Sequence, residues 1–517
     1  MRSRRLVPLI AVSVFATLTP GLATAAPAAP PAPASPVATP AAQYPQQKPV
    51  WKRCAADEPA SFQCATIRVP LNYAKPGGKK IGVEISRIKA TSPSERRGVL
   101  LFNPGGPGGE GLGMSLDMSR ELPASVRARY DLIGFDPRGI GRSTPVRCGL
   151  ADSQKSWPRP YKADTYAQDV SWAKSVADKC RAKVGDTLKH ITTRNTARDM
   201  DVIRAALGEK KLNYLGYSYG TYLGSVYTQM FPKRADRFVL DSAVDPEKAW
   251  RETFRIWGPE VEPAFDRWTE WTAGRSAEYQ LGDTPEKVAK TFWDLVAHAD
   301  RKPIVIGKTA YDGDMLRYVM RSAFFSVRVA AESTVILRDA AAGKPVPEQP
   351  DFGPIPDNHI SAQWAVLCGD TRWNSSAETY RKEAARDAAR YPLFGDHSGN
   401  ITPCAFWGRT AEPRTKVDNK AGALIVQNEW DSQTPLSTAR GMHRAMKGSK
   451  LVTVDEGEGH GVYLYGKNAC ADKVANAYLN TGKLPAKDVT CKAAAGKRGS
   501  QQTVVPAPKP PLQLDRG

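Results

Sequence analysis

One serine of this chain stands in a sequence pattern suited to nucleophilic catalysis. Residues 216–220 read Gly-Tyr-Ser-Tyr-Gly, the only Gly-x-Ser-x-Gly match in the sequence. Leu212–Tyr217 has strand character, and the residues that follow have helical character until Pro232. A serine at such a strand-to-helix turn exposes its hydroxyl, and glycines two residues to either side avoid collisions in the tight turn. The pattern therefore predicts Ser218 as a nucleophile.

A serine hydroxyl is weakly nucleophilic until a general base takes its proton. The sequence has six histidines. His460 fits best, because residues 457–461 read Gly-Glu-Gly-His-Gly and follow an expected strand at Leu451–Val454. In enzymes of the α/β-hydrolase fold the chain order is nucleophile, acid, histidine, and the histidine follows the last strand. His443 lies in an expected helix and is predicted to be a surface or packing residue.

The acid of such a triad orients the imidazole and stabilises the imidazolium as it forms. Asp431 follows the expected strand Ala423–Gln427 and lies between the serine and the histidine in the sequence. Glu429 on the same turn and Asp455 at the end of the next strand are alternatives. We favour Asp431, because Glu429 is expected to point elsewhere on the turn and Asp455 lies too close to its strand.

Acyl transfer also requires N–H donors for the developing oxyanion. Asn103–Gly109 reads Asn-Pro-Gly-Gly-Pro-Gly-Gly and follows an expected strand at Gly98–Phe102. So many glycines let the backbone approach a substrate, which predicts one donor at Gly105 or Gly106 and a second at the N–H of Tyr219. A phosphate-binding loop is the alternative for a glycine-rich turn, but the sequence lacks Gly-x-x-x-x-Gly-Lys-Ser/Thr.

Strands and helices alternate through the first half of the chain, and strands return near its end. This alternation predicts a mostly parallel sheet covered by helices. Together with the serine pattern at residues 216–220 it indicates the α/β-hydrolase fold. Residues 247–418 have helical patterning and many charged residues, which predicts a helical insertion in a core formed by residues 50–246 and 419–491. The remaining expected elements are strands at Ile81–Ile88, Tyr130–Phe135 and Arg237–Leu240 and a helix around Thr196–Leu207.

Both ends of the chain differ in composition from its body. A basic start precedes a short apolar run, and residues 23–25 read Ala-Thr-Ala, the small-residue pattern of signal-peptidase cleavage. Residues 1–25 are therefore predicted to be a secretory signal peptide, so the protein is expected to be secreted. Residues 26–49 are Ala/Pro-rich and are predicted to be a propeptide or linker. Residues 492–517 are predicted to be a disordered tail, because they cannot bury enough apolar surface.

Eight cysteines that fall into four sequence-local pairs favour an oxidising compartment. No pair has the tight Cys-x-x-Cys spacing of a metal site, and neither a metal nor an organic cofactor is implied. The expected disulfides are Cys54–Cys64, Cys148–Cys180, Cys368–Cys404 and Cys470–Cys491.

The chain has a formal net charge of +20, from 73 basic and 53 acidic residues. The basic residues are scattered and form no patch interleaved with aromatic residues, so no nucleic-acid partner is expected. A generally cationic surface is suited to loose association with anionic cell-wall polymers. No segment after the leader is apolar enough to predict a membrane span.

Together these motifs resemble the proline-iminopeptidase-like branch of the α/β-hydrolases, and within it the secreted tripeptidyl aminopeptidases of actinomycetes. The resemblance extends over residues 50–490. It departs from the family at Asn103, where many relatives have His, and at Ser242, where Gly is expected. The motifs that carry it are Asn103–Gly109, Asp136–Ser143, Asn213–Thr221, Leu240-Asp241, Asp245-Pro246, Asp431, Thr434-Pro435 and Gly459–Gly461.

The resemblance implies a serine exopeptidase that releases tripeptides from peptide substrates with free N-termini, beneath a lid formed by the insertion. Such an enzyme must capture the substrate's ammonium, so carboxylates are expected in the lid: Asp370 and Glu252, with Glu260 and Glu262 as further candidates. A secreted carboxylesterase or lipase needs the same triad and is the alternative, although this charged insertion differs from the apolar lid of a lipase. A non-catalytic binding protein is disfavoured, because all three triad residues are present.

Overall fold

The computed structural model describes residues 47–155, 159–347, 355–408 and 410–493. All of these residues belong to one unit of the chain. The predicted signal peptide lies outside the described residues, as do residues 26–46 of the predicted linker and 494–517 of the predicted tail.

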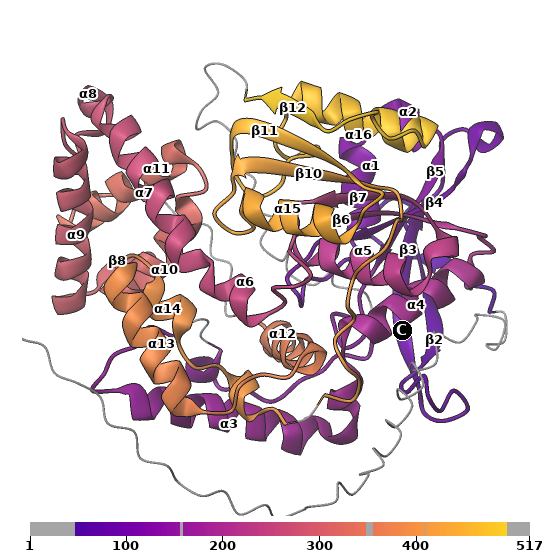
Figure 1. The fold of residues 1–517 in the computed structure, drawn as a ribbon, viewed down its shortest axis with the longest axis horizontal. Helices are drawn as coiled ribbons and strands as arrows, with labels where there is room; N and C mark the ends of the chain where they lie inside the picture. Colours follow the sequence, from indigo (N-terminus) through magenta and orange to yellow (C-terminus); the bar gives the residue numbers. More distant parts are fainter. Residues whose placement is uncertain (1–46, 156–158, 348–354, 409, 494–517) are drawn as a thin grey trace, which may run out of the picture. The chain divides into compact units, whose positions relative to one another are not determined.

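A ten-stranded sheet forms the centre of the core (Figure 1). Its order is β1-β2-β3-β5-β4-β6-β7-β10-β11-β12. The pairings from β1 to β5 are antiparallel, and every pairing from β5 to β12 is parallel, which confirms the predicted fold class. The strands are β1 (Lys52–Arg53), β2 (Gln63–Pro70), β3 (Lys80–Ile88), β4 (Gly98–Asn103), β5 (Tyr130–Phe135), β6 (Leu212–Tyr217), β7 (Ala235–Asp241), β10 (Ala423–Trp430), β11 (Lys450–Glu458) and β12 (Val489–Lys492).

Helices cover both faces of this sheet, because successive side chains of each strand point to opposite faces. In β10, Ala423 and Ile425 belong to one apolar cluster, whereas Leu424 and Val426 belong to a second cluster on the other face. All four side chains are fully buried. The first cluster includes α4 (Thr193–Ala206), α5 (Tyr219–Met230) and α15 (Leu436–Ala445), and the second includes α1 (Met114–Glu121), α2 (Ala124–Arg127) and α16 (Ala469–Thr481) (Figure 1).

The parallel strands bring the predicted site residues to one edge of the sheet. Ser218 directly follows β6, Asp431 directly follows β10, and His460 lies two residues beyond β11. The glycine-rich loop begins at the end of β4, the neighbour of β6. Because these strands are parallel, their carboxyl ends share one edge, where α/β proteins build their sites.

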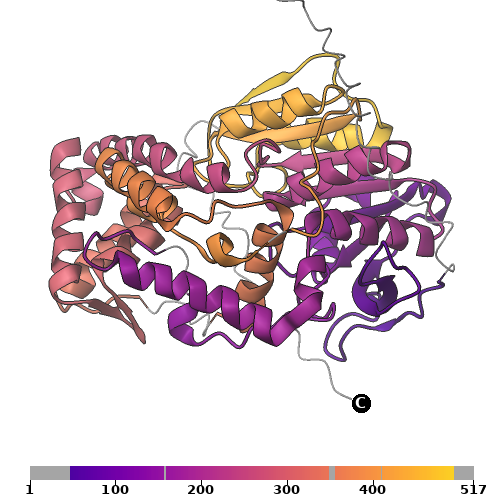
Figure 2. The ribbon, with the colours of Figure 1, turned by 60° about the horizontal axis from the view of Figure 1, so that its bottom comes forward.

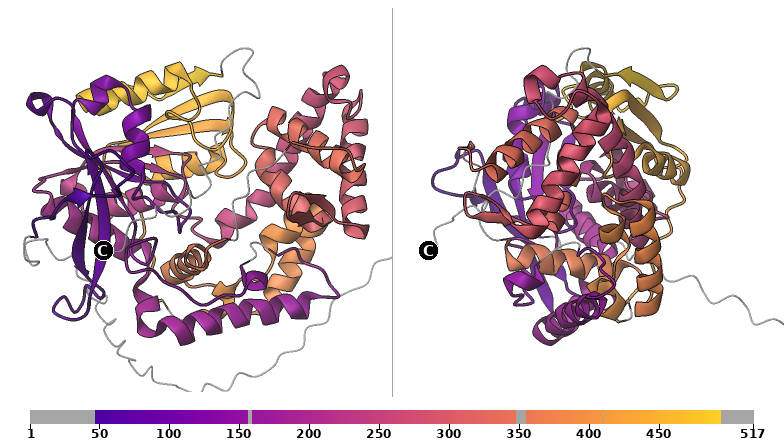
Figure 3. Two further views of the ribbon diagram at one scale, coloured as in Figure 1. Left: turned by 180° about the vertical axis from the view of Figure 1, so that it is seen from behind. Right: turned by 90° about the vertical axis from the view of Figure 1, so that its left-hand side faces the viewer.

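The insertion of residues 247–418 divides between two apolar cores. Helices α7, α9, α10 and α11 form a separate cluster with the loop residues Leu393 and Phe394 (Figure 3). Helix α12 instead joins the main core, together with α3 (Tyr166–Val184) from the first half of the chain (Figure 2). The elements of the insertion are α6 (Arg251–Arg255), α7 (Trp257–Ala273), α8 (Ser276–Tyr279), α9 (Pro285–Arg301), β8 (Ile304–Ile306), β9 (Thr309–Tyr311), α10 (Gly313–Ala323), α11 (Val327–Ala341), α12 (Asp357–Asp370), α13 (Ala377–Arg390) and α14 (Gly395–Gly399).

Four disulfides join the same cysteine pairs that the sequence analysis lists. They are Cys54–Cys64, Cys148–Cys180, Cys368–Cys404 and Cys470–Cys491. Cys180 lies on α3 and Cys368 on α12, so two of the bridges lie where the first half of the chain meets the insertion. Among the described residues, no helix has the length and apolar character that a membrane span requires.

Candidate active site

Ser218 occupies a strained turn between β6 and α5. Its backbone has φ 55° and ψ −122°, a left-handed conformation that serine rarely adopts. The Ser218 N–H donates to the carbonyl of Asp241 at the end of β7, 2.9 Å away. Tyr217 and Tyr219 are buried, whereas Ser218 keeps part of its surface accessible. The turn therefore presents the serine hydroxyl at the edge of the sheet, as predicted for a nucleophile elbow.

The glycine-rich loop lies directly against this turn. Gly105 has φ +100°, and a Cβ atom there would lie 2.6 Å from the Tyr217 carbonyl oxygen and 3.0 Å from the Ser218 Cβ. Only glycine permits this approach. The Gly105 N–H donates to Asn103 Oδ1 at 3.1 Å. The N–H groups of Gly106 and Tyr219 have no acceptor in the described part of the chain, so these two of the three predicted donors are free for a substrate.

Asp431 and His460 form a direct hydrogen bond. The distance from Asp431 Oδ2 to His460 Nδ1 is 2.8 Å. Asp431 is buried, and its other oxygen accepts the backbone N–H groups of Gln433 (2.9 Å) and Thr434 (3.0 Å). The Thr434 hydroxyl also donates to Oδ2 at 2.9 Å. These bonds fix the carboxylate, and the carboxylate in turn fixes the orientation of the imidazole.

The competing residues have other contacts. Glu429 accepts the N–H of Glu456 at 2.9 Å. Asp455 lies within β11 and pairs with Lys492 of β12. His443 Nδ1 lies 2.7 Å from the Ser449 hydroxyl, in the packing role expected of it.

Asp241 joins the serine turn to the histidine loop, a role that the sequence analysis missed. Its carbonyl accepts the Ser218 N–H, and its carboxylate accepts the N–H groups of Val462 (3.0 Å) and Tyr463 (2.6 Å). No hydrogen bond connects the Ser218 hydroxyl to His460 among the described residues; such bonds often tighten only when substrate binds. The sequence feature that could have revealed this role of Asp241 is the motif Leu240-Asp241, in which an acidic residue stands at the end of a buried strand.

Ser242, where relatives are expected to have Gly, also holds the histidine loop. Its φ is 58°, in the region that favours glycine. Its hydroxyl accepts the N–H of Gly461 at 2.8 Å and donates to Asp241 at 3.0 Å. The serine thus replaces the conformational freedom of glycine with a hydrogen bond to the residue after His460.

Burial of Asp241 predicts a measurable pH dependence of stability. Desolvation raises the pKa of Asp241 from 3.8 to about 7. Between these values the folded protein binds a proton that the unfolded chain does not, so stability falls as the pH rises from about 4 to about 7. Asp241→Asn lacks this titration, and its amide can still accept from Val462 and Tyr463.

We therefore expect the difference in free energy of unfolding, Asp241→Asn minus wild type, to increase by up to about 1.4 kcal/mol for each pH unit by which the pH rises across this window. Urea unfolding at several pH values measures the difference, and the other buried acids cancel in the comparison. A difference between the two proteins that does not change with pH would contradict the prediction.

The insertion reaches the site through two aromatic residues. The Trp257 Nε1–H at the start of α7 donates to the Gln433 carbonyl, two residues after Asp431, at 2.8 Å. The Phe325 ring, just after α10, lies 6.0 Å from the His460 ring between centroids. The insertion therefore contacts the His460 ring and the turn that follows Asp431.

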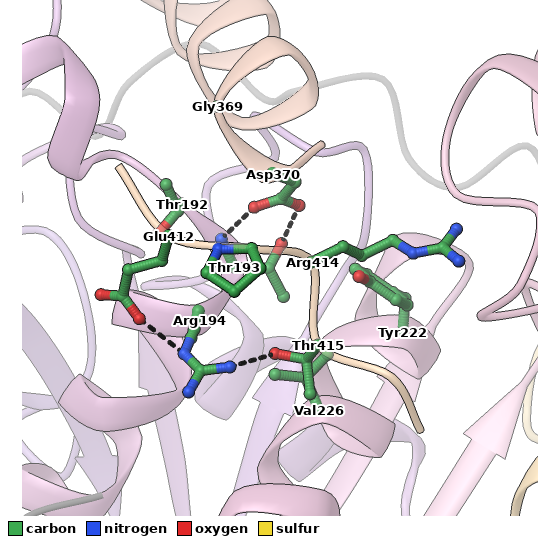
Figure 4. A pocket seen from close by; sticks show the side chains of 11 residues that line it. Thr192, Thr193, Arg194, Tyr222, Val226, Gly369, Asp370, Glu412, Arg414 and Thr415 are labelled. Carbon is green, nitrogen blue, oxygen red and sulfur yellow. Dashed lines mark hydrogen bonds and ion pairs between the residues drawn. The ribbon is translucent and has the colours of Figure 1, made fainter. Parts of the chain in front are cut away.

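Asp370, one of the predicted ammonium-binding acids, is engaged by the chain itself. Its carboxylate accepts the Thr193 N–H (2.7 Å), the Thr193 hydroxyl (2.6 Å) and the Trp250 Nε1–H (3.1 Å). Burial raises its pKa to about 6. It lines a pocket between α4, α12 and residues 412–415 that contains neither Ser218 nor the His460–Asp431 pair (Figure 4). The Thr193 hydroxyl also lies 2.8 Å from the Tyr219 hydroxyl, so Thr193 links Asp370 to the residue that follows Ser218.

The other three candidate acids differ in their surroundings. Glu252 is exposed on α6. Glu262 on α7 accepts the Leu393 N–H at 3.0 Å. Glu260 is half-buried on the first turn of α7, and its side chain has no hydrogen-bond partner among the described residues. It lies close enough to Lys248, Arg267 and Asp431 for their charges to interact. Burial raises the pKa of Glu260. The structure thus brings Glu260, but neither Asp370 nor Glu252, toward the His460–Asp431 pair.

Comparisons with known proteins agree with this geometry. Residues 98–288 match the family model of the α/β-hydrolase fold, and residues 391–491 match that of TAP-like proteins. A tripeptidyl aminopeptidase of Streptomyces lividans is 36% identical over 478 residues, 87% of each chain. The serine protease Hip1 of Mycobacterium tuberculosis is 30% identical over 85% of this chain and 90% of its own. Carboxylesterase B of the same species is 31% identical over 86% of this chain and 90% of its own. The chain is therefore a hydrolase of the α/β-hydrolase fold that belongs to the family of the tripeptidyl aminopeptidases.

Proposed function

We propose that this protein is a secreted serine peptidase that removes tripeptides from free N-termini with Ser218, His460 and Asp431. The observation that carries the proposal is the His460–Asp431 hydrogen bond at the strand edge where Ser218 stands in its strained turn. The four disulfides support an extracellular location, because such bridges persist in oxidising compartments.

In the proposed reaction, Nε2 of His460 takes the proton of the Ser218 hydroxyl as the oxygen attacks the peptide carbonyl. Nδ1 keeps its proton in the hydrogen bond to Asp431, which stabilises the imidazolium. The free N–H groups of Gly106 and Tyr219 receive the oxyanion, each worth about 3–4 kcal/mol in reactions of this kind. His460 then gives its proton to the leaving amine, and water hydrolyses the acyl-enzyme by the reverse sequence of proton transfers.

The exopeptidase part of the proposal depends on Glu260. An enzyme that reads a free N-terminus needs a carboxylate that is near the reacting groups and not already paired. Glu260 lies close enough to Asp431 for their charges to interact. Lys248 and Arg267 also interact with it electrostatically, but its carboxylate has no ion-pair or hydrogen-bond partner in the described part of the chain. Its partial burial strengthens its attraction for an ammonium group.

Tripeptidyl chromogenic amides test the activity directly. The purified protein is assayed on the same tripeptidyl amide with a free and with an acetylated N-terminus, alongside amides of one and two residues. We expect cleavage of the free tripeptidyl amide and little cleavage of its acetylated form. Equal cleavage of the two forms would reject the aminopeptidase proposal.

Glu260→Gln should weaken the recognition of the N-terminus alone. We expect the KM for the free tripeptidyl amide to rise by about tenfold, the typical loss when one partner of a charge-assisted hydrogen bond is removed. The kcat/KM for the acetylated substrate should stay near the wild-type value. Glu262→Gln is the matched control, because Glu262 lies on the same helix but binds the Leu393 N–H. A similar KM in both variants would remove Glu260 from the proposed site.

A carboxylesterase is the second candidate, because one relative with matching coverage is named Carboxylesterase B. An ester and a peptide use the same acyl-transfer groups, so the choice depends on the leaving group and the lid. Short-chain p-nitrophenyl esters assayed beside the tripeptidyl amides decide between them. Ester hydrolysis without amide hydrolysis would favour the esterase.

A further inference from the structure

A buried arginine of the insertion has no acidic partner among the described residues. Arg321 on α10 is 7% exposed. Its guanidinium carbon lies 4.3 Å from the ring centre of Trp257, 5.1 Å from that of Phe394 and 5.8 Å from that of Phe325. Its Nε and Nη1 atoms are buried and have no hydrogen-bond partner. Three aromatic rings thus lie against the guanidinium, and its Nε–H and Nη1–H groups have no acceptor among the described residues.

Two of these rings locate Arg321 beside the His460–Asp431 pair. Trp257 donates to the carbonyl of Gln433, two residues after Asp431. The Phe325 ring lies 6.0 Å from that of His460. Asp431 is also close enough to interact electrostatically with Arg321, although its oxygens are occupied by His460 and by residues 433–434.

A second arginine on the same helix has carboxylate partners, in contrast to Arg321. Arg317, one turn earlier on α10, donates to Asp314 at 2.9 Å and to Asp396 at 2.7 Å. Arg321 has no such carboxylate. Aromatic faces attract a cation but accept no in-plane N–H bonds, and a buried charge without an acceptor is costly. An acceptor that the chain does not supply would remove this cost.

We propose that Arg321 binds a carboxylate of the substrate and is a specificity-determining residue of this site. The inference rests on the proposed hydrolase function of Ser218 and its partners. A carboxylate is the matching group, because its two oxygens accept parallel N–H bonds from a guanidinium. A peptide can offer one as its C-terminal α-carboxylate or as an Asp or Glu side chain.

Inhibition of a neutral ester reaction tests the binding without relying on peptide cleavage. Hydrolysis of p-nitrophenyl acetate is measured with two pairs of inhibitors. N-acetylalanine and N-acetylalaninamide differ in an α-carboxylate, and N-acetylglutamic acid α-amide and N-acetylglutamine amide differ in a side-chain carboxylate. We expect the carboxylate of at least one pair to inhibit the wild type about tenfold or more tightly than its amide. The pair that shows the difference identifies the source.

Arg321→Met should reduce the ratio of the two inhibition constants, amide over carboxylate, to near one. This ratio compares two inhibitors on one protein, so it does not depend on the variant's own rate of ester hydrolysis. Arg321→Lys keeps the charge without the planar fork, so it should retain part of the ratio. Arg317→Met is the matched control and should keep the full ratio. No discrimination by the wild type in either pair, or discrimination that survives in Arg321→Met, would overturn the inference. Failure to cleave peptides, with discrimination intact, would reject only the peptidase proposal.

Discussion

Replacing Ser218 with alanine is expected to lower kcat by about a million-fold, the loss seen when the nucleophile of a serine peptidase is removed. In the proposed mechanism the hydroxyl oxygen becomes acylated, so neither His460 nor the N–H groups of Gly106 and Tyr219 can substitute for it. The residual rate should come from oxyanion stabilisation and substrate binding alone. Steady-state hydrolysis of the free tripeptidyl amide measures the loss.

Alanine should leave the fold intact, because the Ser218 N–H still donates to Asp241 and the hydroxyl has no partner among the described residues. Ser225→Ala on α5, the helix that begins directly after Ser218, is the matched control, since its hydroxyl bonds only the Tyr222 carbonyl. It should keep wild-type kcat. Substantial activity in Ser218→Ala, after contamination is excluded by mass spectrometry, would refute the proposed mechanism.

Asp431→Asn is expected to lower kcat by about ten-thousand-fold while KM changes little. The asparagine side chain has nearly the same shape, and its oxygen can still accept the N–H groups of Gln433 and Thr434. Its amide nitrogen would then face Nδ1 of His460, which could accept but no longer donate. The imidazole would carry its proton on Nε2, the nitrogen that must take the proton of Ser218.

Glu429→Gln is the control for this variant, because Glu429 lies two residues away but binds the N–H of Glu456. Its kcat should equal that of the wild type. The two variants together decide between the acids that the sequence left in competition. A large loss of kcat in Glu429→Gln together with a small loss in Asp431→Asn would assign the role of the triad acid to Glu429.

The sequence predicts those parts of the site that depend on local chain geometry. The β6–Ser218–α5 turn, the glycine loop after β4 and the strands β5 and β6 follow from short patterns, since hydrophobic runs and turn residues act over a few positions. The predicted bounds of β5 and β6 match the structure, and α4 begins three residues earlier than expected, at the cap formed by Thr192.

Contacts between distant segments could not be predicted in this way. Asp241 holds a loop more than 200 residues further along the chain, and nothing in its immediate neighbours specifies that partner. Asp370 looks like a free lid carboxylate in the sequence, yet Thr193 and Trp250 occupy its oxygens. Arg321 is one of many basic residues until packing encloses it. Burial and pairing of charged groups are properties of tertiary structure, and local patterns in a single sequence do not predict them.

The division of the insertion between two apolar cores also depends on tertiary packing and could not be predicted from the sequence. Residues 247–418 share helical patterning, but α12 packs with α3 into the main core while α7, α9, α10 and α11 form their own. Helical periodicity shows which face of a helix is apolar and not which neighbour covers it.

The bonds made by Asp241 have a consequence for when the enzyme can first act during its own synthesis. The serine turn is held by the Asp241 carbonyl, but the loop that carries the base is held by the Asp241 carboxylate and follows β11. Until β10 has paired with β7 and β11 with β10, the base has no fixed position. If the proposed mechanism holds, a growing chain that has folded its first half, with Ser218 in place, still lacks its base. We therefore expect no activity from the growing chain before β10 and β11 have joined the sheet.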